Sequence, residues 1–256
     1  MSDTNERGRF VWHELMTTDT GAALQFYQAV TGWEAQKWGD GADYTILKAN
    51  GSQIGGVMPM MGGASGASPR WIAYVEVPNI DDTATLAPTL GGNIGMGPHS
   101  AEGVGRFAAF TDPQGAIFAA ITSQNRTTPE TDPKRGEFSW HELLTTDYKS
   151  ADAFYNKLFG WEKKSEFDMG PMGTYYMFGR DRFTYGGMFN KPSSVAAPPH
   201  WLHYVHVDSA DAAAERATKA GGTVINGPME VPGGDRIAAI VDPQGAPFAV
   251  HSKPNS

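Results

Sequence analysis

The stretch Trp12-His13-Glu14-Leu15, continued by Phe26-Tyr27 and Gly32-Trp33-Glu34, decides the fold because it occurs twice. It returns 128 residues later as Trp140-His141-Glu142-Leu143, Phe154-Tyr155 and Gly160-Trp161-Glu162. The turn Asp112-Pro113-Gln114-Gly115 likewise returns as Asp242-Pro243-Gln244-Gly245. A period this long is too large for a solenoid unit and about right for a domain. The sequence therefore predicts a tandem duplication, with a first domain over 1–124, a linker over 125–136 and a second domain over 137–256.

The composition narrows the class of protein. Hydrophobic residues make up 40% of the chain and charged residues 19%, which is typical of a soluble globular protein. A net charge of -8 without a Lys/Arg run argues against a nucleic-acid partner. The sequence has neither a long apolar window nor an apolar signal-peptide core, so we expect no membrane association and a cytoplasmic location. Because cysteine is absent, disulfides, thiolate metal sites and cysteine nucleophiles are excluded.

Local patterns predict the same order of elements in each half of a repeat. A strand over 10–17 precedes a helix over 21–30, which Asp19 opens as an N-cap and Gly32 ends. Three short strand-like runs follow, separated by glycine and Asn-Gly turns. A second strand, helix and three strands complete the repeat, and Pro88 should shorten or kink the second helix. The prediction is an α+β fold of four βαβββ modules.

These motifs together resemble the vicinal oxygen chelate superfamily, which includes glyoxalase I, bleomycin resistance proteins and extradiol dioxygenases. The resemblance rests on Asp19, Phe26-Tyr27, Gly32-Trp33 and Asp112-Pro113-Gln114-Gly115, which occur in this order and occur twice. It covers the chain from Phe10 to about His251 and is closest to the tandem two-domain branch. It implies two glyoxalase/bleomycin-resistance-like domains with curved mixed sheets around open cavities. Fold alone does not give function.

Metal-dependent members of this superfamily bind a divalent ion with His or Glu side chains, and the resemblance implies where those ligands would stand. None of the matched positions holds a ligand: they fall on Trp12 and Trp140, Ile72 and Leu202, Ala119 and Ala249, and within 54–57 and 185–188. His13 and His141 stand one residue away from the first position. Because strand side chains alternate between faces, we interpret both as packed histidines that point away from the cavity, unless a bulge reverses the parity. We therefore expect no metal and no cofactor.

The same alternation predicts which side chains line the two cavities. Glu14 and Glu142 are the candidate catalytic residues, because a carboxylate among apolar and aromatic groups can act as a general acid or base. Alternatively, each carboxylate caps a backbone N–H or pairs with Arg106 or Arg236. The candidate ligand-binding residues are mostly aromatic and aliphatic, as is usual for small-molecule sites: Trp12, Met16, Tyr74, Glu76, Trp140, Leu144, Tyr204 and His206.

Three functions remain open from the sequence. The first is a metal-independent protein that binds a hydrophobic or aromatic metabolite or antibiotic, as a monomer (an internal pseudo-dimer) or a weak homodimer. The second is a metal-free enzyme of the same superfamily that uses Glu14 or Glu142, with lyase, isomerase or hydroxylase/dioxygenase-like chemistry. The third is a divalent-metal enzyme whose ligands lie elsewhere. Whether modules pair within one repeat or across the two is also open, since both arrangements satisfy the strand patterns.

Overall fold

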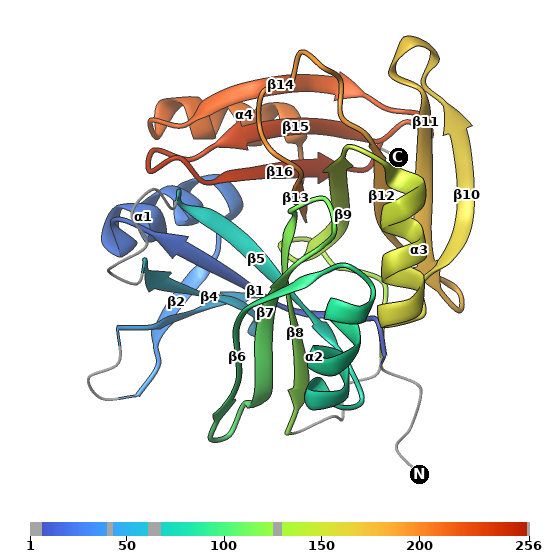
Figure 1. Cartoon of the computed structure of the whole chain (residues 1–256). Helices are drawn as coiled ribbons and strands as arrows, with labels where there is room; N and C mark the ends of the chain where they lie inside the picture. Colours follow the sequence, from blue (N-terminus) through green and yellow to red (C-terminus); the bar gives the residue numbers. More distant parts are fainter. Residues whose placement is uncertain (1–6, 40–42, 61–67, 125–129, 255–256) are drawn as a thin grey trace. The chain divides into compact units, whose positions relative to one another are not determined.

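The computed structural model describes residues 7–39, 43–60, 68–124 and 130–254. Residues 125–129 of the expected linker lie outside the described residues. Each repeat forms two βαβββ modules, so the predicted α+β class and module order are confirmed (Figure 1). Among the described residues, none of the helices has the length and apolar character needed to cross a membrane.

Within its described residues, the first repeat contains eight strands and two helices. Its first module consists of β1 (Phe10–Thr17), α1 (Thr20–Thr31), β2 (Glu34–Lys37), β3 (Thr45–Ala49) and β4 (Ser52–Pro59). Its second module consists of β5 (Arg70–Glu76), α2 (Ile80–Thr89), β6 (Asn93–Ala101), β7 (Gly105–Thr111) and β8 (Ile117–Ser123).

The second repeat has the same order, with an added 3-10 turn, η2 (Gly170–Met172). Its first module consists of β9 (Phe138–Thr145), α3 (Tyr148–Phe159), β10 (Glu162–Asp168), β11 (Thr174–Arg180) and β12 (Phe183–Asn190). Its second module consists of β13 (His200–His206), α4 (Ala210–Lys219), β14 (Thr223–Glu230), β15 (Arg236–Val241) and β16 (Pro247–Ser252).

Each repeat folds into one mixed eight-stranded sheet. The strand order is β2-β3-β4-β1-β5-β8-β7-β6 in the first sheet and β10-β11-β12-β9-β13-β16-β15-β14 in the second. The module's first strand runs parallel to its last strand, as for β1 and β4, whereas hairpin neighbours such as β3 and β4 are antiparallel. The helix of each module is the crossover that this parallel pairing requires.

The helices begin and end where the sequence predicts. The side chain of Asp19 accepts a hydrogen bond from the backbone N–H of Ala22 and caps α1. Gly32 adopts the left-handed conformation at the C-cap, with a φ of 78°. Pro88 is the last but one residue of α2, so the helix ends at Thr89 rather than continuing.

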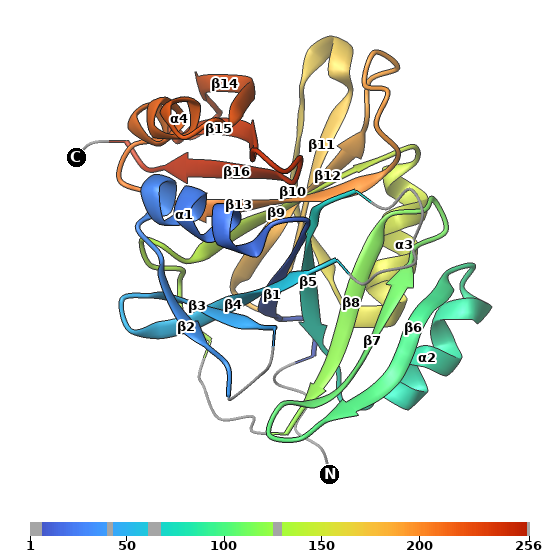
Figure 2. The same cartoon turned by 90° about the vertical axis from the view of Figure 1, so that its left-hand side faces the viewer.

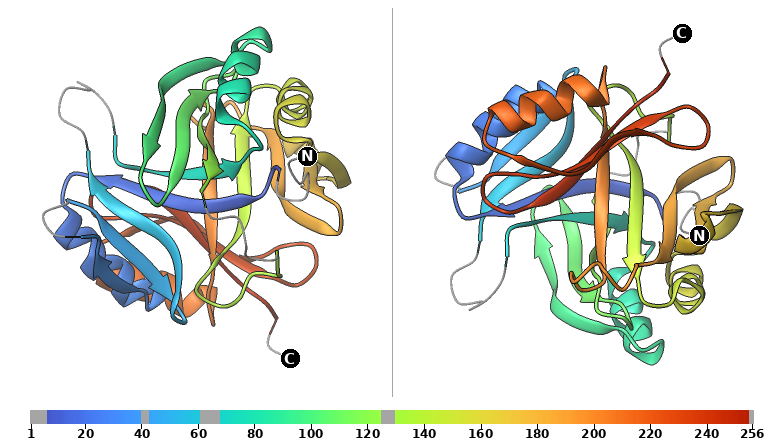
Figure 3. Two further views of the ribbon diagram at one scale, coloured as in Figure 1. Left: turned by 90° about the horizontal axis from the view of Figure 1, so that it is seen from below. Right: turned by 90° about the horizontal axis from the view of Figure 1, so that it is seen from above.

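Packing divides the chain into two compact units, and each unit combines modules from both repeats. Unit 1 comprises Met1–Val11, Ala73–Thr131 and His141–Trp201; unit 2 comprises Trp12–Ile72, Asp132–Trp140 and Leu202–Ser256. In unit 2, α1 lies beside α4, as Figures 2 and 3 show. In unit 1, α2 contacts α3. Modules of one repeat therefore share a sheet, while the helix layers pair across the repeats.

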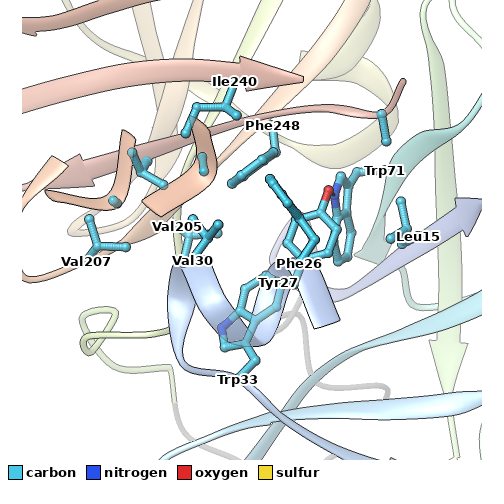
Figure 4. Packing of buried hydrophobic residues seen from close by; sticks show 14 of the residues in the cluster. Leu15, Phe26, Tyr27, Val30, Trp33, Trp71, Val205, Val207, Ile240 and Phe248 are labelled. Carbon is cyan, nitrogen blue, oxygen red and sulfur yellow. Dashed lines mark hydrogen bonds between the residues drawn. The ribbon is translucent and has the colours of Figure 1, made fainter. Parts of the chain in front are cut away.

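A buried chain of hydrogen bonds joins the two repeats inside unit 2. The indole N–H of Trp71 donates to the hydroxyl of Tyr27 at 2.8 Å, and that hydroxyl donates to Oδ2 of Asp242 at 3.1 Å. Figure 4 shows the Tyr27 oxygen beside the Trp71 nitrogen, with Phe26 and Phe248 packed nearby. The repeated Phe-Tyr and Asp-Pro motifs are therefore partners.

Unit 1 contains the reciprocal chain. Trp201 donates to the hydroxyl of Tyr155 at 3.1 Å, and Tyr155 donates to Oδ2 of Asp112 at 3.0 Å. In both turns the other carboxylate oxygen accepts two backbone N–H bonds, for example from Gln114 and Ala116. The Trp201 indole N–H, the Tyr155 hydroxyl and both Asp112 carboxylate oxygens are thereby hydrogen-bonded, as burial requires.

The repeated Gly-Trp motif makes a second pair of reciprocal contacts. The indole N–H of Trp33 donates to the carbonyl oxygen of Gly136, just before β9, at 2.7 Å. The indole of Trp161 donates in the same way to Gly8, just before β1, at 2.6 Å. Each tryptophan is buried and fixes the chain that leads into the other repeat's first strand.

These contacts predict the cost of removing a single hydroxyl. Tyr27→Phe should lower the free energy of unfolding by about 1–3 kcal/mol, because Trp71 and Asp242 both lose a buried partner. Tyr155→Phe should cost a similar amount for the same reason. Urea unfolding followed by fluorescence measures both. Tyr148→Phe, which alters a half-buried tyrosine that contacts Tyr176 through its ring, is the control. Equal midpoints for all three variants would contradict this interpretation.

Candidate functional site

The first strand of unit 2 separates core residues from candidate site residues by alternation. His13, Leu15 and Thr17 are buried, and Leu15 belongs to the core under α1. Trp12, Glu14 and Met16 lie between them in sequence and are half-buried. The side chains of a strand point alternately to opposite faces, so these three residues share the face away from Leu15.

Tyr44 links two of these residues in a hydrogen-bonded chain. The indole N–H of Trp12 donates to the Tyr44 hydroxyl at 3.0 Å, and that hydroxyl hydrogen-bonds to the carboxylate of Glu14. Burial raises the pKa of Tyr44 well above its usual value, and the negative charge of Glu14 raises it further. Tyr44 therefore stays protonated at neutral pH and donates to Glu14.

A glycine makes room for this tyrosine. Gly56 on β4 is the register partner of Glu14 on β1. A Cβ atom at Gly56 would lie 2.1 Å from the Tyr44 hydroxyl oxygen, so no larger residue fits while Tyr44 stays in place. The glycine pair in this strand thus marks a close approach of a side chain to the backbone.

The second repeat has the same arrangement, within unit 1. Glu142 on β9 is the register partner of Gly187 on β12, and the Tyr175 hydroxyl donates to Oε2 of Glu142 at 2.8 Å. A Cβ atom at Gly187 would lie 2.1 Å from the Tyr175 ring. We call this repeated arrangement the Glu–Gly–Tyr motif. In the second copy, Phe167 and Phe189 stack on Tyr175 with centroid distances of 5.1 and 5.8 Å.

Sequence reasoning missed Tyr44 and Tyr175. Their signal was present, since each tyrosine precedes its glycine by 12 residues in both repeats. The pairing of β3 with β4, and of β11 with β12, brings that tyrosine over the glycine. The regular spacing alone does not show that the tyrosine hydroxyl reaches the glutamate. That contact also depends on the parallel register of the strand that carries the glutamate, β1 or β9.

The structure places the other predicted site residues in different surroundings. Tyr74 is buried, edge-to-face with Phe107 at 6.0 Å. Glu76 is buried and accepts hydrogen bonds from the backbone N–H and the hydroxyl of Ser123. Tyr204 is buried, whereas its neighbour His206 is half-buried and stacks on His251 at 4.9 Å. Trp140 and Leu144 are half-buried on β9.

The two candidate arginines bind carboxylates of the protein itself. Arg106 forms a two-pronged pair with Asp81 on α2, at 2.9 and 2.8 Å. Arg236 pairs in the same way with Asp211 on α4, with both distances 2.6 Å. These guanidinium groups therefore link a helix to a strand of the same module, and the glutamates of the Glu–Gly–Tyr motifs accept from tyrosines instead.

Three buried histidines, His13, His141 and His203, have the residue type and burial that suit metal ligands. In unit 2, the ring centroids of His13 and His203 lie 5.4 Å apart, and a ring nitrogen of one lies within 4.8 Å of a ring nitrogen of the other. Burial lowers the pKa of His13, and the proximity of His203 lowers it further, so the His13 imidazole is neutral at pH 7. His13 also stacks on Phe138, and in unit 1 His141 stacks on Phe10, both at 3.7 Å.

Comparison with known proteins identifies the family. The family model described as Glyoxalase/Bleomycin resistance protein/Dioxygenase superfamily matches residues 9–119 and again 137–250. The chain is 32% identical over 243 residues to "Putative glyoxylase CFP32" of Mycobacterium bovis, covering 93% of this chain and 92% of that protein. It is 30% identical to "Anthracycline biosynthesis protein DauV" of Streptomyces sp., covering 95% and 92%.

Among solved structures, the fold is similar to that of the Mn(II)-bound glyoxalase from Novosphingobium aromaticivorans. The TM-score is 0.65 at 15% identity, and the match covers 98% of this chain and 83% of that one. The two family matches fall one on each repeat, and the predicted resemblance is confirmed. The chain therefore belongs to the Glyoxalase/Bleomycin resistance protein/Dioxygenase superfamily.

Proposed function

We propose that this protein binds a hydrophobic or aromatic small molecule without a metal ion, at the two Glu–Gly–Tyr motifs. The observation that carries the proposal is the repetition of the motif, with one carboxylate held by one tyrosine in each repeat. Glu14 and Glu142 are half-buried on the strand face opposite to Leu15 and Leu143, so contacts in the hydrophobic core do not account for the hydroxyl–carboxylate bond in either copy. A fixed polar group among aromatic and aliphatic side chains is the usual composition of a small-molecule site.

The surrounding side chains favour an aromatic ligand. Trp12 presents a half-buried indole whose N–H is already engaged, so its ring is held in a fixed orientation for stacking. Met16 lies beside Met58 on the neighbouring strand, and methionine adapts well to aromatic surfaces. The similarity to a protein of anthracycline biosynthesis supports a planar, polycyclic ligand class.

The residues at the superfamily's expected ligand positions do not fit a metal. Trp12 donates an indole N–H there, Ile72 and Leu202 are apolar, and Ala119 and Ala249 are buried alanines. The fourth-strand positions contain Gly56 and Gly187, which lie under tyrosines. None of these groups donates a lone pair to a divalent ion. The proposed binding therefore relies on the side chains of the chain alone.

The second candidate function is metal-dependent and rests on the buried histidines. His13 and His203 together offer two buried imidazoles in unit 2, of which His13 is neutral at pH 7, and His141 is a third buried imidazole. Imidazole nitrogen is a good ligand for zinc, nickel, copper and iron. This alternative assigns the chemistry to residues outside the Glu–Gly–Tyr motifs, which makes the two candidates separable by mutation.

Metal analysis distinguishes these candidates. Protein purified without a histidine tag should contain much less than one transition-metal ion per chain, and chelator treatment should leave ligand affinity unchanged. Elemental analysis by mass spectrometry gives the metal content. Stoichiometric metal that is lost in His13→Asn and His203→Asn, with the fold intact by circular dichroism, would support the metal-dependent function instead.

Ligand binding is measured with a fluorescent anthracycline. Trp12→Ala should weaken binding roughly 30-fold, equivalent to about 2 kcal/mol for a lost aromatic contact. Trp38→Ala is the control, because Trp38 is an exposed tryptophan of the same module. Glu14→Gln and Glu142→Gln separate binding from catalysis: retained affinity with lost turnover of a bound substrate indicates a glutamate base. Equal affinities of Trp12→Ala, Trp38→Ala and the parent would contradict the proposed site.

The glycine of the motif gives an independent prediction. Gly56→Ala should displace Tyr44, break its bond to Glu14 and weaken anthracycline binding about tenfold or more, at a stability cost of about 1–3 kcal/mol. Titration and urea unfolding measure the two effects. Gly95→Ala is the control, because a Cβ atom there meets only the carbonyl oxygen of Ala109 at an ordinary 3.6 Å. Unchanged binding in Gly56→Ala would show that the Tyr44 position does not matter to the ligand.

A further inference from the structure

A polar cluster in unit 2 joins three side chains that are far apart in the sequence. Oγ of Ser139, on β9, lies 2.8 Å from Nδ1 of His251, on β16. Nε2 of His251 lies 3.2 Å from Oδ2 of Asp235, which directly precedes β15. We call these residues the Ser139–His251–Asp235 cluster. The ring of His206 stacks on that of His251 and holds it from the neighbouring strand β13.

The hydrogen-bond pattern determines where the imidazole proton lies. An ionised carboxylate only accepts, so Asp235 requires a proton on Nε2 of His251. In the neutral ring, Nδ1 then carries the lone pair, and the Ser139 hydroxyl donates to it. The alternative acceptor for that hydroxyl, the carbonyl oxygen of Tyr204, is farther away at 3.4 Å.

The protonation of His251 supports this arrangement. Burial lowers the pKa of His251; the neighbouring His206 and Lys253 lower it further, while Asp235 acts in the opposite direction. The imidazole is therefore neutral at pH 7 and can accept a proton. The cluster is also reachable from solvent, since the His251 side chain is 13% exposed and Asp235 is 35% exposed.

The cluster is confined to the second repeat. The equivalent positions of the first repeat hold Val11, Ile121 and Gly105, so nothing in the duplicated framework requires it. Ser123 of the first repeat is a natural contrast, because its hydroxyl bonds to the carboxylate of Glu76. The second repeat therefore holds a serine, a base and an orienting carboxylate in hydrogen-bonding order, and the first repeat does not hold these residues at the equivalent positions.

We propose that Ser139 is a nucleophile for acyl transfer from esters, with His251 as its base and Asp235 as the positioning residue for the imidazole. Oγ of Ser139 attacks the ester carbonyl while its proton moves to Nδ1 of His251. The ester C–O bond then breaks, and the alcohol leaves with that proton. Water, deprotonated by His251, hydrolyses the acyl-serine and restores the hydroxyl. The net reaction converts an ester and water into a carboxylic acid and an alcohol.

Labelling by a fluorophosphonate probe tests this assignment on the full chain. Peptide mass spectrometry should find the probe on Ser139 and not on Ser123, and Ser139→Ala should abolish the labelling. His251→Gln should slow labelling and p-nitrophenyl acetate hydrolysis roughly a hundredfold, the usual contribution of a general base. Asp235→Asn should slow both at least roughly tenfold, because it disturbs the imidazole tautomer.

Two outcomes would overturn the proposal. One is labelling of Ser139 no faster than that of Ser123 in the parent protein. The other is labelling that is unchanged in both His251→Gln and Asp235→Asn. Thermal melting of each variant shows whether it is folded; if His251→Gln unfolds, Asp235→Asn and the Ser139 to Ser123 ratio in the parent still decide. Loss of anthracycline binding has no bearing on this test, because the cluster shares no residue with the Glu–Gly–Tyr motifs.

Discussion

The structure depends on a buried tyrosine hydroxyl that accepts a hydrogen bond from an indole N–H and donates one to a carboxylate. An indole N–H can only donate and a carboxylate can only accept, so the Tyr27 hydroxyl between Trp71 and Asp242 has a single arrangement that pairs all three. Since Asp242 belongs to the other repeat, the α1 layer is completed only by the second half of the chain. The reciprocal chain of Tyr155 has the same consequence for α3. Neither repeat can bury these groups at low cost by itself.

The first strand of each repeat, β1 or β9, packs one face against the hydrophobic core. Its opposite face is available for a site. Leu15 and Leu143 are fully buried in the two cores, and their positions fix the register of β1 and β9. The glutamates one residue earlier are then directed to the other face by the pleat alone. The parallel partner strand supplies a glycine at the same level, which leaves space for a tyrosine. The site is thus a by-product of the register that the core imposes.

Much of this was accessible from the sequence, and the remainder was not for identifiable reasons. Local sequence patterns predict the modules and the helix caps at Asp19 and Gly32. Strand alternation also predicts that Trp12, Glu14 and Met16 lie on the face opposite to Leu15. The partners of Phe-Tyr and Asp-Pro could not be assigned, because identical motifs in two repeats are compatible with pairing within or across them. The Tyr44–Glu14 bond and the position of His251 beside Ser139 depend on how three strands are arranged next to one another. The periodicity of a single strand does not predict that arrangement.

The two repeats differ in side chains that take part in neither the Tyr–Asp nor the Trp–Gly contacts. The Tyr–Asp and Trp–Gly contacts occur in both repeats and join each repeat to the other. The Glu–Gly–Tyr motif also occurs in both, on the strand face opposite to the core. At the equivalent ends of β5 and β13, however, Glu76 is buried against Ser123 while His206 stacks on His251. A substitution at these strand ends alters a local polar cluster and leaves the Tyr–Asp and Trp–Gly residues unchanged. The two repeats therefore carry different polar clusters at the ends of equivalent central strands, on the same underlying framework.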